Sequence, residues 1–223
     1  KRGFYIWRPA KDGREPNNWR SYFSPSAWEW NKATGDYYLH LFSKKQPDLN
    51  WKNQEVRQEI YKMMCWWLEK GIDGFRMDVI NFLAKAPGLP DALPRTGQEG
   101  RYVFNKSLYT NQPGIHEILQ EMNREVLGKY DIMTVGETPA VTAEMAPLYV
   151  AAERKELNMI FHTEITGMRN WDLVQFKKIW RKWSGVLDHN GWLTSFLGNH
   201  DQPRAVSRFG DEQTYWRESA KLL

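Results

Sequence analysis

The chain has 223 residues, a formal net charge of +4 and a single cysteine, Cys65. This length allows one large domain or two small ones, and the mild charge without a long basic run argues against a nucleic-acid partner. One cysteine excludes a disulfide framework and a cysteine-based zinc cluster and fits a reducing compartment, so we expect a cytoplasmic protein. No apolar run approaches the roughly 18 residues of a membrane span and no secretory signal opens the chain, so we expect no membrane contact, and a monomer.

Residues 1–50 predict a small irregular region, because turn formers and aromatic residues dominate and helical periodicity is missing. The segments 5–9 and 28–42 predict short strands, and residues 11–18 predict a loop. We interpret this region as the C-terminal part of a small inserted subdomain, and residues 51–223 as the main domain. The chain also has twelve tryptophans and ten each of tyrosine and phenylalanine. Such aromatic residues pack a core or line a carbohydrate cleft, and we expect most of them in the core.

From residue 53 onward, helix and strand patterns alternate. Asn53 is a suitable N-cap for a helix that ends at Lys70, where Gly71 can terminate it. Further helical patterns cover residues 115–127, 139–153, 173–187 and a start at 213, strand patterns cover 75–80, 132–137, 157–161 and 192–197, and residues 83–114 predict a long loop. Strict alternation with apolar strands predicts an α/β fold, in which helices cover a parallel sheet.

Polar groups follow three of these strands, namely Asp78, Glu137 and the group 199–201. No G-x-G-x-x-G or Walker phosphate loop is present, which disfavours a nucleotide-binding sheet. Chemistry at the C-terminal ends of several parallel strands is the arrangement of a (β/α)-barrel enzyme.

The segment 71–82 contains an arginine and a carboxylate two residues apart. Side chains alternate along a strand, so Arg76 and Asp78 are expected on one face and Val79 on the other. An arginine keeps a neighbouring carboxylate ionised and fixes its direction, as a glycosidic nucleophile requires. A structural ion pair explains these two residues equally well.

The strand-end acids Asp78, Glu137 and Asp201 converge if their strands share one barrel. Two carboxyl groups about 5–5.5 Å apart can carry out retaining glycoside hydrolysis, one as nucleophile and one as acid and then base. A second carboxylate and partial burial favour the protonated form that the acid needs. The third carboxylate, that of Asp201 next to His200, could accept hydrogen bonds from sugar hydroxyl groups and stabilise positive charge at the anomeric carbon. Singly, Glu137 could instead begin a helix and Asp201 could cap a turn.

Three segments resemble three of the four core motifs of the α-amylase family of glycoside hydrolases: GFRMDVI at 74–80, VGET at 135–138 and NHDQPR at 199–204. The segment QPDLN at 46–50 resembles the additional motif of the oligo-1,6-glucosidase branch. These motifs occur in the family order. The resemblance implies about strands four to seven of a (β/α)8 TIM barrel, preceded by part of the small inserted subdomain.

The resemblance also implies catalytic roles. Asp78 would be the nucleophile, Glu137 the proton donor and Asp201 the stabiliser of the transition state. Arg76 and His200 would contact the substrate and the nucleophile at the −1 subsite.

The specificity follows from the same resemblance. In this branch the residue after the nucleophile tracks linkage preference, and valine there, as at Val79, goes with α-1,6 bonds. Arg204 is expected to bind substrate as well. The implied protein is a retaining exo-acting α-glucosidase of carbohydrate metabolism, which hydrolyses isomaltose and isomalto-oligosaccharides.

The sequence departs from the family pattern in two ways. The first family motif, the eighth strand and the C-terminal β-domain are missing, so we expect this segment to be unstable and inactive alone, because half a barrel leaves strand edges unpaired. At 161–164 the branch usually has a glutamine and another aromatic residue, followed by a longer loop, which changes the expected substrate mouth.

Several alternatives share these motifs, namely an α-1,4-glucosidase, a trehalose-6-phosphate hydrolase and a sucrose isomerase. A non-enzymatic alternative is a heavy subunit of an amino-acid transporter, although such proteins typically lose the catalytic acids. The five histidines lack the spacing of metal ligands. We therefore expect no metal and no cofactor in this segment, with any calcium site in the missing N-terminal part.

Overall fold

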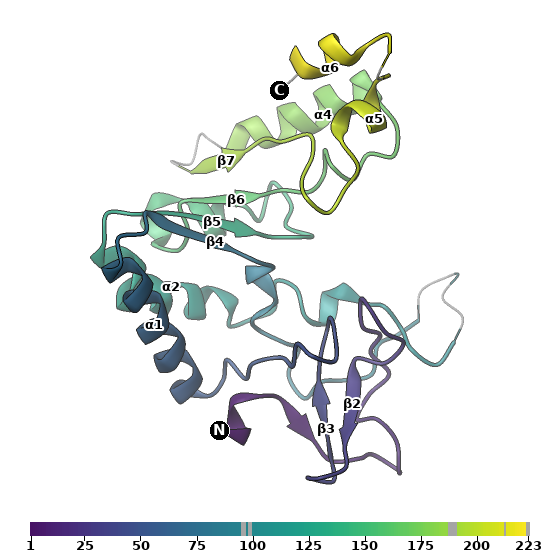
Figure 1. Cartoon of the computed structure of the whole chain (residues 1–223), viewed down its shortest axis with the longest axis vertical. Coiled ribbons are helices and arrows are strands. Elements are labelled where there is room, and N and C mark those ends of the chain that lie inside the picture. Colours follow the sequence, from purple (N-terminus) through teal and green to yellow (C-terminus); the bar gives the residue numbers. More distant parts are fainter. Residues whose placement is uncertain (95–96, 98–99, 187–190, 212, 222–223) are drawn as a thin grey trace. The chain divides into compact units, whose positions relative to one another are not determined.

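The computed structural model describes residues 1–94, 97, 100–186, 191–211 and 213–221. The chain divides into two compact units (Figure 1). Unit one comprises residues 1–72 and 82–118, and unit two comprises residues 73–81 and 119–223. The expected division into a subdomain over 1–50 and a barrel domain over 51–223 stays a prediction.

Unit one contains a small antiparallel sheet made of the predicted short strands. The strands β1 (Trp7–Arg8), β3 (Asp36–Leu39) and β2 (Trp28–Asn31) lie in that order. Beside them, Trp19 and Trp28 are buried, and their indole N–H groups donate to the Pro90 carbonyl at 2.8 Å and to the Asn17 side chain at 2.7 Å. Buried indoles need such partners, so these two rings form a satisfied core.

The segment 46–50 packs inside unit one through its acid. Asp48 accepts a hydrogen bond from the Leu41 N–H at 2.9 Å and pairs with the Lys85 ammonium at 2.5 Å. Both side chains are almost entirely buried, and Lys85 also donates to the Phe82 carbonyl at 2.9 Å. A buried charge is tolerated only when it is paired in this way. The segment therefore anchors the start of the long loop.

The helix α1 (Gln54–Glu69) confirms the capping prediction. The Asn53 side chain accepts from the Glu55 N–H at 2.9 Å, and the Gly71 N–H donates to the Leu68 carbonyl at 2.9 Å. Its buried residues keep helical spacing and comprise Val56, Tyr61, Met64 and Leu68.

The prediction that most aromatic residues lie in the core is wrong, as the tryptophans illustrate. Four are buried, namely Trp19, Trp28, Trp51 and Trp183, whereas Trp30, Trp66, Trp67, Trp180, Trp192 and Trp216 are exposed. Aromatic content alone does not report which face of a helix is buried. In α1, for example, Trp66 and Trp67 lie away from the buried face.

Unit two contains the predicted parallel sheet. The strands β4 (Gly74–Met77), β5 (Met133–Glu137), β6 (Met159–Phe161) and β7 (Trp192–Thr194) lie side by side in chain order (Figure 1). Every pairing is parallel, so the carboxyl ends of all four strands lie at one edge. The strands expected over 75–80 and 192–197 end earlier than predicted.

Glycine is required where β4 begins. A Cβ at Gly74, whose φ is +149°, would lie 1.8 Å from the carbonyl oxygen of Met133. Only a residue without a side chain allows this close approach between β4 and β5.

Helices separate the strands as predicted, with some differences in extent. They are α2 (Ile115–Glu125), α3 (Pro147–Val150) and α4 (Leu173–Ser184), and α5 (Ala205–Phe209) and α6 (Trp216–Lys221) follow β7. The chain also contains the 3-10 turns Arg2–Phe4, Ile80–Phe82, Lys106–Leu108, Leu127–Lys129 and Ala152–Arg154. The Asp172 side chain caps α4 by accepting from the N–H groups of Val174 and Gln175. Leu187, expected in this helix, lies outside the described residues. No helix in the described part of the chain is long and apolar enough to span a membrane.

The helix expected over 139–153 is largely absent. The chain there forms turns, then the single helical turn of α3 and a 3-10 turn. Pro147 lacks an N–H and clashes with the preceding turn of a helix, so a helix can start near it but cannot run through it. The apolar spacing of this segment was therefore a misleading signal.

Candidate active site

Three charged side chains meet at the carboxyl ends of β4 and β5. The Arg76 guanidinium pairs with Asp78 through Nη1 and with Glu137 Oε2 through Nη2, the latter at 2.7 Å. The parallel register places Arg76 beside Val135, two residues before Glu137. Arg76 thus bridges two acids, Asp78 and Glu137, that are 59 positions apart in the chain.

Asp78 reaches this site from a turn rather than from the strand. The strand β4 ends at Met77, and the next residue but one, Val79, has a φ of +34°. Strand alternation therefore stops before Val79, and its expected place on the face opposite Asp78 stays a prediction. A positive φ is strained for a β-branched residue. In this conformation the Val79 N–H lies 3.4 Å from Glu137 Oε2.

The two acids differ in exposure and in proton affinity. The Glu137 side chain is 17% exposed and that of Asp78 is 72% exposed. Burial and a hydrogen bond shared with Asp78 raise the pKa of Glu137. Burial opposes ionisation of Asp78 too, but hydrogen bonds with Arg76 and Glu137 outweigh it and lower the pKa of Asp78.

This arrangement favours the protonated form of Glu137 and the ionised form of Asp78. Two carboxyl groups whose surroundings push their pKa values apart are the usual basis for separate acid and nucleophile roles. The pair can therefore protonate a leaving group and attack an electrophilic carbon. Glycoside hydrolysis with retention needs both capabilities.

The predicted residues after β7 are only partly joined to this pair. The charge of His200 contributes to the lowered pKa of Asp78, so His200 lies near the nucleophile candidate. His200 Nε2 lies 3.6 Å from Asp201 Oδ1, and both side chains are mostly exposed. In the described part of the chain, the contacts of Asp201 and Arg204 are otherwise with their own segment, where Arg204 is the N-cap of α5. Sequence reasoning missed one further residue near the pair, Asn81.

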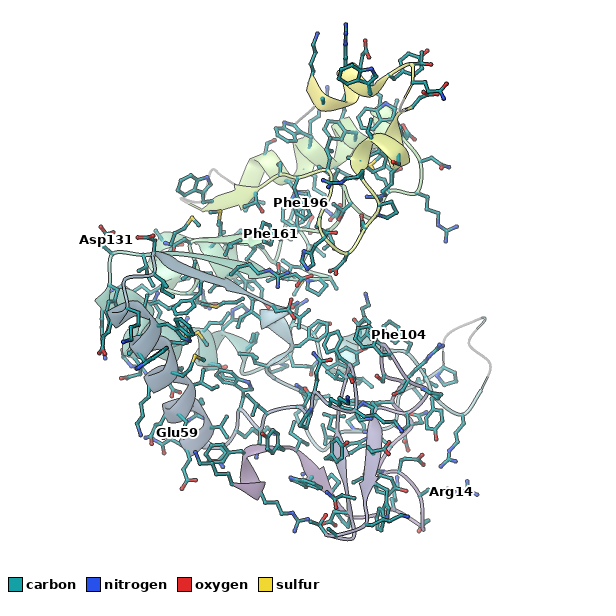
Figure 2. All side chains as sticks on the ribbon, in the orientation of Figure 1. Arg14, Glu59, Phe104, Asp131, Phe161 and Phe196 are labelled. Carbon is teal, nitrogen blue, oxygen red and sulfur yellow. The ribbon has the colours of Figure 1, made fainter. Side chains whose placement is uncertain are left out.

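Two aromatic rings lie at the carboxyl ends of β6 and β7, one at the last residue of β6 and one two residues after β7. Phe161, the register partner of Glu137, contacts Phe196 edge to face with ring centroids 5.2 Å apart (Figure 2). In the unusual segment 161–164, Glu164 is partly exposed and pairs with Lys182 at 2.8 Å. His162 is buried and stacks on Trp183 at 4.0 Å, and burial lowers its pKa to about 4.

The described residues contain no cluster of three or more histidine, cysteine, aspartate or glutamate side chains arranged to hold a metal ion. The expectation that the protein needs no metal or cofactor stays a prediction.

Comparison with known proteins gives the family. The model of the alpha-amylase catalytic domain matches residues 1–223, the whole chain. The chain belongs to the alpha-amylase family. The (β/α)8 barrel of that family accounts for the parallel sheet and for the functional groups at its carboxyl edge.

Its alpha-amylase relatives differ in activity. The oligo-1,6-glucosidase of Parageobacillus thermoglucosidasius is 56% identical over 232 residues, which cover 100% of this chain and 41% of that protein. The trehalose-6-phosphate hydrolase of Bacillus subtilis (strain 168) is 44% identical over 100% of this chain and 40% of its own length. The crystal structure of the isomaltulose synthase SmuA from Protaminobacter rubrum matches with a TM-score of 0.87 at 39% identity, over 97% of this chain and 40% of that one. The chain thus spans about two fifths of the length of these relatives.

Proposed function

We propose that the protein carrying this chain is a retaining, exo-acting α-glucosidase that cleaves α-1,6 bonds of isomaltose and isomalto-oligosaccharides. The observation that carries the proposal is the Asp78–Glu137 pair. Arg76 contacts both acids, and the pKa of Asp78 is lowered whereas that of Glu137 is raised. Family membership and 56% identity to an oligo-1,6-glucosidase support the same activity.

The proposed mechanism is a double displacement. An Asp78 oxygen bonds to the anomeric carbon as the glycosidic bond breaks, and Glu137 gives its proton to the departing oxygen. A water molecule then loses a proton to Glu137 and attacks the same carbon, which releases Asp78 and retains the configuration. Arg76 keeps Asp78 ionised before the first step. Asp201 would stabilise positive charge on the sugar in both transition states.

The remaining predicted residues would determine binding. His200 and Arg204 would contact sugar hydroxyl groups, and Val79 would narrow the space that receives the leaving sugar. Three oligo-1,6-glucosidases are 55–56% identical to this chain, whereas the trehalose-6-phosphate hydrolase is 44% identical. This difference favours α-1,6 linkages over the alternatives. Neither chemical step requires a cofactor, and we propose none.

The test is the specificity constant of the full-length protein for four substrates. We expect the highest kcat/KM for isomaltose, compared with maltose, sucrose and trehalose 6-phosphate. Preference for maltose or trehalose 6-phosphate, or conversion of sucrose to an isomer, would favour the corresponding alternative instead. No turnover of any of the four would contradict the enzyme proposal and favour a binding role.

A further inference from the structure

Asn81 connects the two segments that carry the paired acids. It lies three residues after Asp78 and is completely buried. Its Nδ2 group donates a hydrogen bond of 2.8 Å to the carbonyl oxygen of Pro139, which lies two residues after Glu137. Since a buried amide needs a partner, this bond cannot be exchanged for water without opening the site.

The Pro139 carbonyl is oriented by an unusual turn. The Val141 N–H donates to the Thr138 carbonyl at 3.3 Å, with Pro139 and Ala140 at the central positions. Ala140 has a φ of +65°. Proline followed by a residue of positive φ is typical of a type II turn, where glycine is the usual choice. Alanine is strained there, and such strain persists only where the surrounding structure fixes it.

The same two segments also meet through an apolar contact. A Cβ added at Gly136 would lie 2.8 Å from a methyl carbon of Ile80, in the turn between Asp78 and Asn81. The absence of a side chain at 136 therefore lets this turn rest on the end of β5. The Asn81–Pro139 hydrogen bond is a second contact between these two segments.

We propose that Asn81 is a positioning residue that fixes the separation of Asp78 and Glu137 by tying the turn after one acid to the turn after the other. It acts through the backbone carbonyl of Pro139. The inference rests on the proposed function, because the separation matters only if the two carboxyl groups act on one bond.

A small change in this separation would have a large effect on rate. A displacement of about 1 Å in a reacting group can cost on the order of 100-fold in rate. The shared hydrogen bond also raises the pKa of Glu137 and lowers that of Asp78. A looser pair would bring both pKa values back toward ordinary values, so the active pH interval would narrow from both sides.

The experiment compares Asn81→Leu and Asn81→Ala in the full-length protein. Leucine keeps most of the buried volume without the donor, and alanine removes both. We expect kcat for an aryl α-glucoside to fall about 10- to 100-fold, with KM changed by less than about threefold and a narrower pH profile of kcat/KM. The matched control is Asn123→Ala, because Asn123 also donates from Nδ2 to a backbone carbonyl of unit two, that of Glu156 at 3.1 Å.

The outcomes separate this inference from the proposed function. Wild-type kcat and pH profile in either folded Asn81 variant would overturn the positioning role, as would a failure of both variants to fold, which would make Asn81 a residue of the fold alone. An equal change in Asn123→Ala would also overturn it. If the wild type is inactive, or if Glu137→Gln is as active as the wild type, the proposed function itself fails.

Discussion

The two ends of the parallel sheet of unit two each hold a glutamate paired with an arginine. At the carboxyl end, Glu137 contacts Arg76 at 2.7 Å. Just before the amino end of β6, Glu156 contacts Arg154 at 2.8 Å, and its side chain is completely buried. The Gln120 amide also donates to Glu156, at 3.1 Å.

The difference between them is a second acid. The Arg154 guanidinium and the Gln120 amide both donate to the Glu156 carboxylate. Glu137 shares a hydrogen bond with Asp78, and the turn that brings Asp78 there contains the strained Val79. An Arg–Glu pair is therefore weak evidence of function by itself. A second carboxyl group within hydrogen-bonding reach, held by strained backbone, is much stronger evidence.

The largest expected effect comes from Glu137→Gln, which removes the acidic proton of this side chain and keeps the side chain's size and shape. We expect kcat for isomaltose to fall by about 10²- to 10⁴-fold, the usual contribution of a general acid. The thermal unfolding midpoint should not fall, because the buried acid is replaced by a neutral amide. Steady-state kinetics and a thermal melt measure both quantities.

The matched control is Glu144→Gln, an exposed glutamate in the segment that follows β5. It should leave kcat unchanged. Turnover by Glu137→Gln within about twofold of the wild type would contradict the acid–base role of Glu137 and its functional difference from Glu156.

The opposite result is expected for Glu156→Ala, which should affect stability rather than chemistry. Removing a buried carboxylate takes away the acceptor of Arg154 Nη2 and of the Gln120 amide, which costs about 2–3 kcal/mol. Denaturant unfolding would measure the loss, and kcat of the folded enzyme should stay at the wild-type value. Glu153→Ala, an exposed neighbour, should change stability by less than about 0.5 kcal/mol. A loss of kcat in Glu156→Ala without loss of stability would contradict the assignment.

The smallest effect is a displacement of the pH profile by Arg76→Gln. The rate needs an ionised Asp78 and a protonated Glu137, so it falls at low pH as Asp78 gains a proton and at high pH as Glu137 loses one. Burial is the largest single influence on each pKa and raises both, whereas the positive charge of Arg76 lowers both. Its removal should therefore move both limbs of the kcat/KM profile to higher pH. Arg154→Gln should move neither, and an unchanged profile in Arg76→Gln would show that the guanidinium does not control the pair.

Much of α1 in unit one and of the sheet in unit two could be predicted from the sequence because the signals are local. Asn53 and Gly71 at the ends of α1 act on neighbouring backbone groups, and the apolar strands alternate with amphipathic helices. The pairing of Arg76 with Asp78 was also predicted correctly, although strand alternation was the wrong reason. Strand ends were less accurate, since nothing in the side chain of Val79 indicates a positive φ.

The contacts that were missed depend on distant parts of the chain. Asn81 reaches a carbonyl 58 residues away, and the turn that orients this carbonyl has alanine where glycine is usual. The helix expected over 139–153 was wrong for a simpler reason, because Pro147 interrupts it. The short helix α5 has too few residues for a periodic pattern to be recognised.

The most direct test of the central claim is to identify the residue that bonds to the sugar. The full-length protein would be treated with a fluorinated α-glucosyl fluoride, which reacts in the first step and slows the second, then digested and analysed by mass spectrometry. We predict one fluoroglucosyl adduct, on Asp78. An adduct on any other residue, or the release of β-glucose from isomaltose without an adduct, would contradict the account.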